Sequence, residues 1–324
     1  MIARSPLRWA LAVGMFLVFP ALTPIGSLGQ TAGGEKYSMM SPQALIQAWE
    51  SAGRRERPLI EDALIGNRLA SLLVLRDRLI NGSYEEKRFA ASLVAEMRDR
   101  ASVDALLAAS HDADNRVRTR AITALRLIGD PRALPRLREL AQTASEGPVL
   151  KVTVAALGRL GSSQDLGLLR PMLLHPDAHV RVIAAAALAM QGSSEGQAIL
   201  LESTRSPDPL AQQEATFGLG YLATPEARAR LSEILDSPAG RWKSYAAIGL
   251  ALQDISAMGV NAKRVEYLSR LAKQRQDWIV AGWAVEQLAD LGLPEARQVL
   301  QDLARSGGKA GERAGRTIRA RGWE

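Results

Sequence analysis

Residues 112–129 read DADNRVRTRAITALRLIG, and the same pattern returns at 175–192 as HPDAHVRVIAAAALAMQG and at 206–223 as SPDPLAQQEATFGLGYLA. In each stretch an acidic residue is followed by apolar or small residues four positions apart that end in a leucine. Residues at i, i+4 and i+8 lie on one face of an α-helix. An acidic residue just before a helix can accept hydrogen bonds from its free amides. Each stretch is therefore predicted to be a capped helix with one core-facing stripe.

The leucine of this pattern recurs through most of the chain. The successive positions are Leu93, Leu125, Leu157, Leu188, Leu219, Leu250, Leu288 and Ile318, separated by 32, 32, 31, 31, 31, 38 and 30 residues. Second apolar segments with helical spacing, such as 133–141 and 226–235, lie between the leucine-bearing ones. Periods of this size indicate a solenoid, in which each unit buries its apolar face only against its neighbours. The sequence predicts an all-α solenoid of about eight stacked helix pairs of roughly 31 residues.

The three stretches resemble the HEAT-repeat family, including the HEAT-like repeats named after phycobilisome lyases. The resemblance follows the family's Asp–Val–Arg–Ala–Leu–Gly pattern and covers residues 66 to 321. It implies an α-solenoid, but this fold carries many functions. The lyase relatives attach or remove pigments, and iron-dependent HEAT-like hydroxylases use His-Glu pairs. No His-Glu pair occurs in this sequence, so neither activity is carried over.

Composition and pattern divide the chain into five parts. With 47% hydrophobic and 23% charged residues among 324, the chain is expected to be globular. The parts are an export signal peptide at 1–29, a flexible linker at 30–40, an N-terminal helical cap at 41–82, the HEAT-like repeat solenoid at 83–304 and a basic C-terminal capping helix at 305–324.

The first residues have the features of an export signal. Arg4 and Arg8 precede the apolar run 9–19, and prolines and small residues follow it. The chain is therefore expected to be periplasmic or secreted after signal cleavage. The alternative is an uncleaved anchor in the inner membrane, since residues 9–28 contain no charge. The sequence has no cysteine, which excludes a lipid-modified cysteine.

Few residues could carry catalysis or hold a metal. The three histidines are His111, His175 and His179, and the last two flank Asp177 in the segment HPDAH. A metal site needs three or four ligands of fixed geometry, so polar turn residues are the favoured interpretation. We expect no catalytic residue, no metal and no cofactor, and predict that the protein is not an enzyme.

Two surfaces are candidates for binding. The positions expected to line the concave face are small or apolar, such as Ala155, Ala186 and Gly158, and aromatic residues gather in the C-terminal half. A trough of this kind suits a peptide or helix anchored by aromatic rings. The alternative is that the rings pack between helices. The predicted protein-binding residues are Phe217, Tyr221, Trp242, Tyr245, Trp278 and Trp283.

The second surface is the basic C-terminus, where Glu312 is the only acidic residue between 305 and 321. It could contact an anionic lipid, a cell-wall polymer or an acidic protein, or it could be a solvated cap; nucleic acid is an unlikely partner. Its predicted residues are Arg305, Lys309, Arg313, Arg316, Arg319 and Arg321.

Together these features predict a non-catalytic protein-binding scaffold or assembly factor of the bacterial cell envelope, with a partner protein that the sequence does not name. The alternatives are an enzyme or enzyme subunit related to HEAT-like lyases and hydroxylases, and a peripheral binder of anionic membrane or cell-wall polymer.

Overall fold

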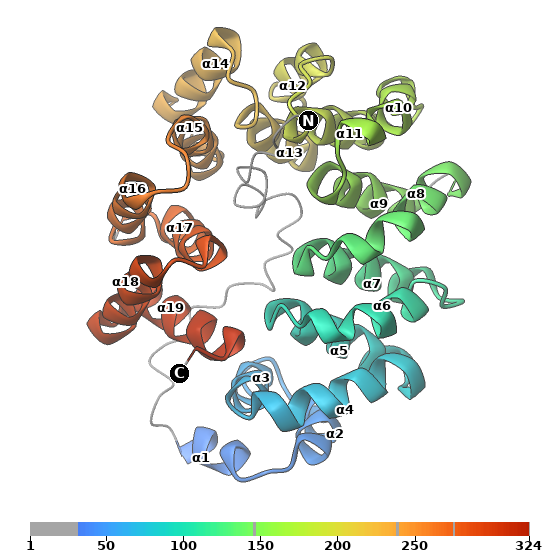
Figure 1. The fold of residues 1–324 in the computed structure, drawn as a ribbon, viewed down its shortest axis with the longest axis vertical. Coiled ribbons are helices and arrows are strands. Elements are labelled where there is room, and N and C mark those ends of the chain that lie inside the picture. Colours follow the sequence, from blue (N-terminus) through green and yellow to red (C-terminus); the bar gives the residue numbers. More distant parts are fainter. Residues whose placement is uncertain (1–31, 145–146, 238–239, 275, 324) are drawn as a thin grey trace, which may run out of the picture.

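The computed structural model describes residues 32–144, 147–237, 240–274 and 276–323, so the predicted signal at 1–29 lies outside the described residues. These described residues form helices and connecting turns, with no strand among them. The helices are arranged in consecutive antiparallel pairs, each packed on the next (Figure 1). The predicted all-α solenoid is confirmed.

Eight consecutive pairs, from α4/α5 to α18/α19, form the body of the fold. The first helices of the pairs lie on the outside (Figure 1): α4 Arg68–Asn81, α6 Val103–Ala109, α8 Leu134–Thr143, α10 Leu166–Leu169 with η5 Arg170–Leu174, α12 Gln197–Ser203, α14 Pro225–Asp236, α16 Ala262–Ala272 and α18 Pro294–Ser306. The second helices carry the repeating leucine and lie on the inside: α5 Tyr84–Glu96, α7 Asn115–Ile128, α9 Gly147–Leu160, α11 Ala178–Met190, α13 Pro209–Leu219, α15 Lys243–Ala257, α17 Trp278–Leu291 and α19 Gly308–Arg321.

From residue 32, where the described part of the chain starts, three helices precede the pairs: α1 Ala32–Ser38, α2 Pro42–Ser51 and α3 Arg57–Gly66. Ser41 caps α2 by accepting a hydrogen bond from the Ala44 amide. Residues 30–40 were expected to be a flexible linker, but 32–38 are helical and Tyr37 is buried. The Tyr37 hydroxyl also donates to Glu56 at 3.1 Å. The burial of Tyr37 and its bond to Glu56 hold this segment against the rest of the fold, which its composition does not indicate.

Aspartates start the inner helices, as the sequence pattern predicts. Asp114, Asp177 and Asp208 each accept a hydrogen bond from the amide two residues on, at 2.7, 2.8 and 3.0 Å. The bonds satisfy amides that have no partner within the helix. At the other end of α7, Gly129 adopts φ 76° and closes the helix in the left-handed conformation.

The repeating leucines form the core. Seven of the eight positions in the ladder are buried, and Leu250 is half-buried. Small residues let the inner helices approach one another closely. A Cβ atom at Gly158 of α9 would lie 2.7 Å from the Ala187 Cα atom of α11, which leaves no room for a side chain.

One outer segment is less regular than the others. Residues 163–174 divide into η4 Ser163–Asp165, the four-residue helix α10 and the 3-10 helix η5. Pro171 explains the division, because proline removes a backbone donor and clashes with the preceding turn of an α-helix.

The solenoid closes into a ring. Figure 1 shows α19 beside α3, so that the last described helix meets the first ones. The predicted C-terminal cap is therefore the inner helix of the last pair, and its outward face contacts another part of the same chain. No described helix has the length and apolar character needed to cross a bilayer.

Candidate functional site

The ring is closed by one arginine and three carboxylates. Arg316 of α19 pairs with Glu61 and Asp62 of α3 at 3.3 and 2.7 Å, and with Glu96 of α5 at 2.5 Å. Burial would raise the pKa of Glu96, but the Arg316 charge and its hydrogen bonds lower it below the ordinary value. Arg68 of α4 adds a second link by donating to the Ala320 carbonyl at 3.0 Å.

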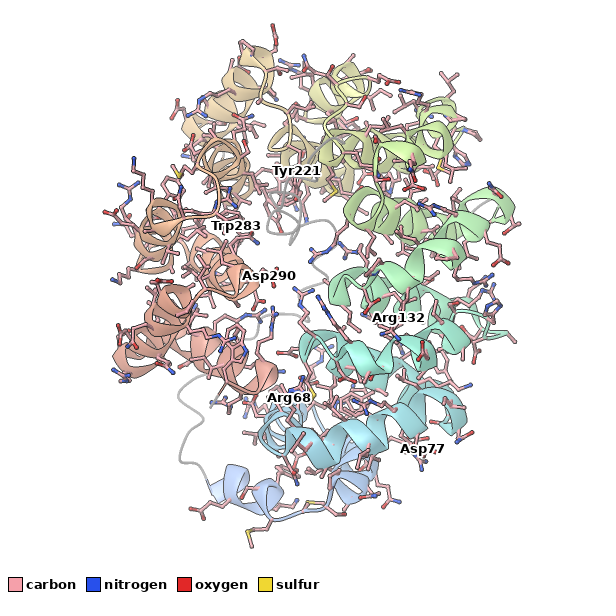
Figure 2. All side chains as sticks on the ribbon, viewed as in Figure 1. Arg68, Asp77, Arg132, Tyr221, Trp283 and Asp290 are labelled. Atoms are coloured by element: carbon pink, nitrogen blue, oxygen red, sulfur yellow. The ribbon has the colours of Figure 1, made fainter. Side chains whose placement is uncertain are left out.

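A cavity of about 480 Å³ lies where this closure brings several helix ends together. It is bounded by the C-terminal ends of α5, α7 and α9 on one side and of α17 and α19 on the other. Figure 2 shows Asp290 and Arg68 on the inner side of the ring. Five arginines and one carboxylate are among the described lining residues. The charged lining residues are Arg68, Arg98, Arg100, Arg159, Arg321 and Asp290.

The charge in the cavity is unevenly paired. Arg321 contacts Asp290 at 2.8 Å and Glu286 at 3.6 Å, and Arg98 is 3.7 Å from Asp290. Burial would raise the pKa of Glu286, but the charges of Arg313, Arg321 and Arg98 lower it to about 2. Arg159 makes no hydrogen bond or ion pair with any residue in the described part of the chain. Burial lowers the pKa of Arg159 to about 10.

The predicted aromatic residues do not form one trough. Phe217 and Trp283 are buried in the core, with Trp283 only 1% exposed, so their assignment to a binding surface is corrected. Aromatic rings of this size contribute most to stability when they are buried between helices. Tyr221 is half-buried inside the ring, and Trp242 and Tyr245 are half-buried against each other. Trp278 is partly exposed and lies beneath the Lys309 ammonium.

The small residues expected to line the concave face are also buried. Ala155, Ala186 and Gly158 have no exposed surface to offer a partner. They face neighbouring inner helices, where the absence of a large side chain permits close approach. The sequence could not separate these two roles, because both favour small residues on the face opposite the leucines.

The basic C-terminal surface is largely used within the chain. Arg316 closes the ring, Arg313 pairs with Glu286 at 2.8 Å, and Arg321 pairs with Asp290. Arg305 stays exposed and pairs with Asp302 on its own helix. The segment 305–321 contains one acidic residue, but acidic residues of α3, α5 and α17 supply the countercharges for its buried arginines. The predicted basic face is thus corrected to an internal contact for Arg313, Arg316 and Arg321.

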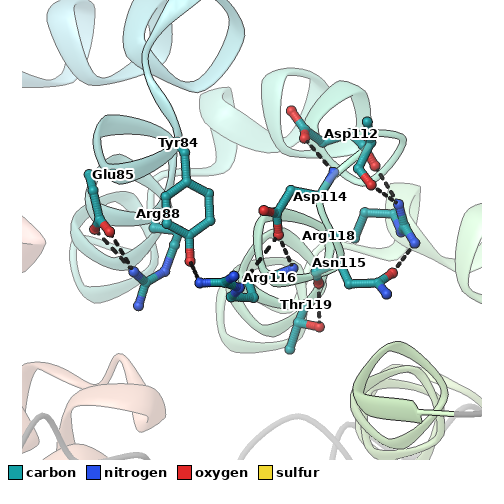
Figure 3. A network of polar contacts seen from close by, with 10 residues as sticks. Tyr84, Glu85, Arg88, Asp112, Asp114, Asn115, Arg116, Arg118 and Thr119 are labelled. Atoms are coloured by element: carbon teal, nitrogen blue, oxygen red, sulfur yellow. Dashed lines mark hydrogen bonds and ion pairs between the residues drawn. The ribbon is translucent and has the colours of Figure 1, made fainter.

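Figure 3 shows the polar network at the start of α7. Arg118 donates to the carbonyls of Asp112 and Ala113 at 2.6 and 2.9 Å, and so holds its own turn. These bonds of Arg118 stay within its own unit. The units are tied by Lys87, whose ammonium contacts Asp112 at 2.7 Å, and by the bond from Arg116 to Tyr84 at 3.2 Å.

The histidines take part in similar contacts. His175 accepts a hydrogen bond from the Asp177 amide, and His179 pairs with Asp208 of the next unit. Lys151 pairs with Asp177 at 2.8 Å, again between adjacent units. Among the described residues, no group of three or more His, Asp or Glu side chains is placed to hold a metal ion.

An exposed apolar stripe on α4 is the surface that the sequence analysis missed. Leu69, Leu73 and Ile80 are 83%, 68% and 55% exposed, and with Asp77 they occupy one face of the helix. The opposite face packs in the core through other leucines, among them Leu75. A helix with apolar residues on two faces is the signal that could have revealed this surface. We call these four residues the α4 stripe.

Comparison with known proteins agrees with this architecture. Residues 72–158 match the family described as HEAT repeats. None of the curated protein sequences matches the chain. Among solved structures, the complex of CpcE and CpcF of phycocyanin lyase from Nostoc sp. is 21% identical, with a TM-score of 0.52 over 68% of this chain and 93% of that chain. This likeness shows the fold.

Two further structures are more distant. Human deoxyhypusine hydroxylase is 18% identical, with a TM-score of 0.35 over 92% of this chain and 100% of that chain. An archaeal HEAT-like repeats protein from Thermococcus onnurineus is 16% identical, with a TM-score of 0.22 over 78% of this chain and 98% of that chain.

Proposed function

We propose that this chain, in which residues 72–158 match HEAT repeats and the same kind of helix pair continues to α19, is a non-catalytic protein-binding scaffold. The α4 stripe is the observation that carries the proposal. A soluble protein seldom exposes several large aliphatic side chains on one face without a use for them. The stripe suits the apolar face of a partner helix.

The chemistry of the stripe limits the partner. Leu69, Leu73 and Ile80 offer apolar contact, while Asp77 places one carboxylate between them. Asp77 is 2.8 Å from Arg78 and accepts a hydrogen bond from Asn81, and its side chain is 44% exposed. A partner helix would present aliphatic or aromatic residues to the leucines and a donor near Asp77. Binding of this kind draws most of its free energy from a few buried anchors.

Capture with matched variants tests the proposal. The tagged full chain, the double variant Leu69→Glu with Leu73→Glu, and the control Leu174→Glu are compared, since Leu174 is 88% exposed on η5 and lies outside the stripe. We expect a partner that purifies with wild type and control, and whose direct affinity falls by about 30-fold or more in the double variant. The proposal would be refuted if the partner bound the double variant as tightly as wild type. It would also be refuted if wild type formed a homodimer and the double variant were a monomer.

We also propose that the scaffold works in the cell envelope. The basic start, apolar run and small residues of 1–29 support this location. Cell fractionation with N-terminal sequencing of the recovered protein tests it. The expected product lacks the first residues and is recovered outside the cytoplasm. Recovery in the cytoplasm with Met1 or Ile2 at the N-terminus would overturn the location and leave the binding proposal intact.

A further inference from the structure

We propose that the arginine-lined cavity at the ring closure binds a small ligand bearing a phosphate or diphosphate group. The cavity lies between the C-terminal ends of α5, α7 and α9 and those of α17 and α19. It is separate from the α4 stripe and independent of the function proposed for that surface. Its volume of about 480 Å³ lies within the range of small-molecule sites.

The described lining residues leave the positive charge of the cavity unbalanced. Asp290 is the single acidic residue among the described lining residues, and it is already 2.8 Å from Arg321. Arg68, Arg98 and Arg159 add further positive charge from α4, the end of α5 and α9. Buried cations without counterions are costly. A site of this composition is complementary to a ligand with more than one negative charge.

Two arginines of the cavity have hydrogen-bond donors without a partner. One terminal nitrogen of Arg98 and one of Arg159 are buried without a partner, and Arg159 makes no hydrogen bond or ion pair at all in the described part of the chain. Guanidinium groups in folded proteins usually use several of their five donors. Their planar fork matches the oxygens of a phosphate group, which can accept two parallel bonds.

Helix capping is the alternative explanation, because cations are favoured at helix C-termini. It accounts for Arg68, which donates to the carbonyls of Ala320 and Met97 at 3.0 Å each. It does not account for Arg159, which donates to no carbonyl in the described part. Capping arginines donate to backbone carbonyls, whereas Arg159 lines the cavity and has a terminal nitrogen without a partner in the described part of the chain.

The backbone at Arg98 adds an independent observation. Arg98 has φ 50°, the one positive φ outside glycine in the described residues. Branched and long side chains rarely adopt this conformation, and such outliers cluster at binding sites. The turn holds Arg98 at the cavity wall, 3.7 Å from Asp290, where a glycine would relieve the backbone but remove the guanidinium. The presence of arginine in this conformation fits a role for its charge.

The test uses the full chain with inorganic pyrophosphate, inorganic phosphate and citrate as probes, each compared with chloride at equal ionic strength. Isothermal titration calorimetry measures affinity, and thermal unfolding measures stability. We expect saturable pyrophosphate binding with one site per chain and weaker phosphate binding. Arg159→Gln should weaken pyrophosphate about ten-fold or more. Arg305→Gln, an exposed arginine on α18, is the matched control and should bind like wild type.

Stability distinguishes a ligand-binding arginine from a structural one. Without ligand, Arg159→Gln should unfold at a higher temperature than wild type, because the variant buries no unpaired charge. The proposal is overturned if wild type does not bind phosphate or pyrophosphate at millimolar concentration, if citrate binds and pyrophosphate does not, or if Arg159→Gln binds pyrophosphate as wild type does. A lower unfolding temperature for this variant would also overturn it. Loss of partner binding in the α4 stripe variants would leave all these results unchanged.

Discussion

Removing the Arg316 guanidinium should open the ring. In Arg316→Gln, the carboxylates of Glu61, Asp62 and Glu96 lose the cation that lies 3.3, 2.7 and 2.5 Å from them. Breaking a buried ion pair by removing one partner costs about 3–5 kcal/mol. Because the three carboxylates keep some contact with water, we expect a loss near the lower limit, about 3 kcal/mol at pH 7.

The loss should depend on pH with a definite sign. Without Arg316, burial and mutual repulsion raise the pKa of the three carboxyls in the folded state above their unfolded values. The free energy of unfolding of the variant is therefore lowered at pH values above those folded pKa values, and it recovers as the pH falls through them. Wild type has the opposite tendency at Glu96, whose lowered pKa contributes stability that is lost as the pH falls. The difference between the two proteins should therefore shrink from pH 7 to pH 4.

Urea unfolding at several pH values measures the free-energy difference, and small-angle X-ray scattering measures the shape. We expect Arg316→Gln to unfold at lower urea and to have a larger radius of gyration at pH 7. Arg305→Gln removes an exposed pair from α18 and should change stability by no more than about 0.5 kcal/mol. If Arg316→Gln matched wild type in stability and shape, or if its loss did not vary with pH, the reasoning about ring closure would be refuted.

Two further predictions concern the packed interior. Leu157→Ala removes a fully buried side chain from the repeat ladder and should lower the free energy of unfolding by about 2–5 kcal/mol in a urea titration; unchanged unfolding would contradict the assigned core. Burial raises the pKa of Glu214 to about 8, and both its carboxyl oxygens lack a hydrogen-bond partner among the described residues. Because its folded pKa lies above the unfolded one, wild type should lose stability as the pH rises from about 4.5 to about 8. Glu214→Gln should abolish that loss and be the more stable protein at pH 9, by a few kcal/mol at about 1.36 kcal/mol per pKa unit; identical pH profiles would disprove the assignment.

The two binding surfaces illustrate where sequence reasoning reached its limit. Trp283 is of a residue type common among interface anchors, yet it is buried in the core. Leu73 is of a residue type common in cores, yet it is exposed. Both lie on helices with apolar residues on more than one face. Periodicity identifies such helices but cannot say which of two apolar faces meets a neighbour. That choice depends on the angle at which adjacent pairs pack.

The sequence by itself determined the repeating unit. Aspartate caps such as Asp114, the leucine at Leu157 and the small residues four positions earlier act within one helix or between neighbours, so a period near 31 residues was enough to predict them. The tertiary structure alone decided that the stack closes on itself and which charges meet there. Arg316 and Glu61 are 255 residues apart, and they meet only because small rotations between successive pairs accumulate around the ring. The total rotation around the ring cannot be predicted from a local sequence pattern. The same closure directs the basic helix α19 toward other parts of the chain and brings the arginines together around one cavity.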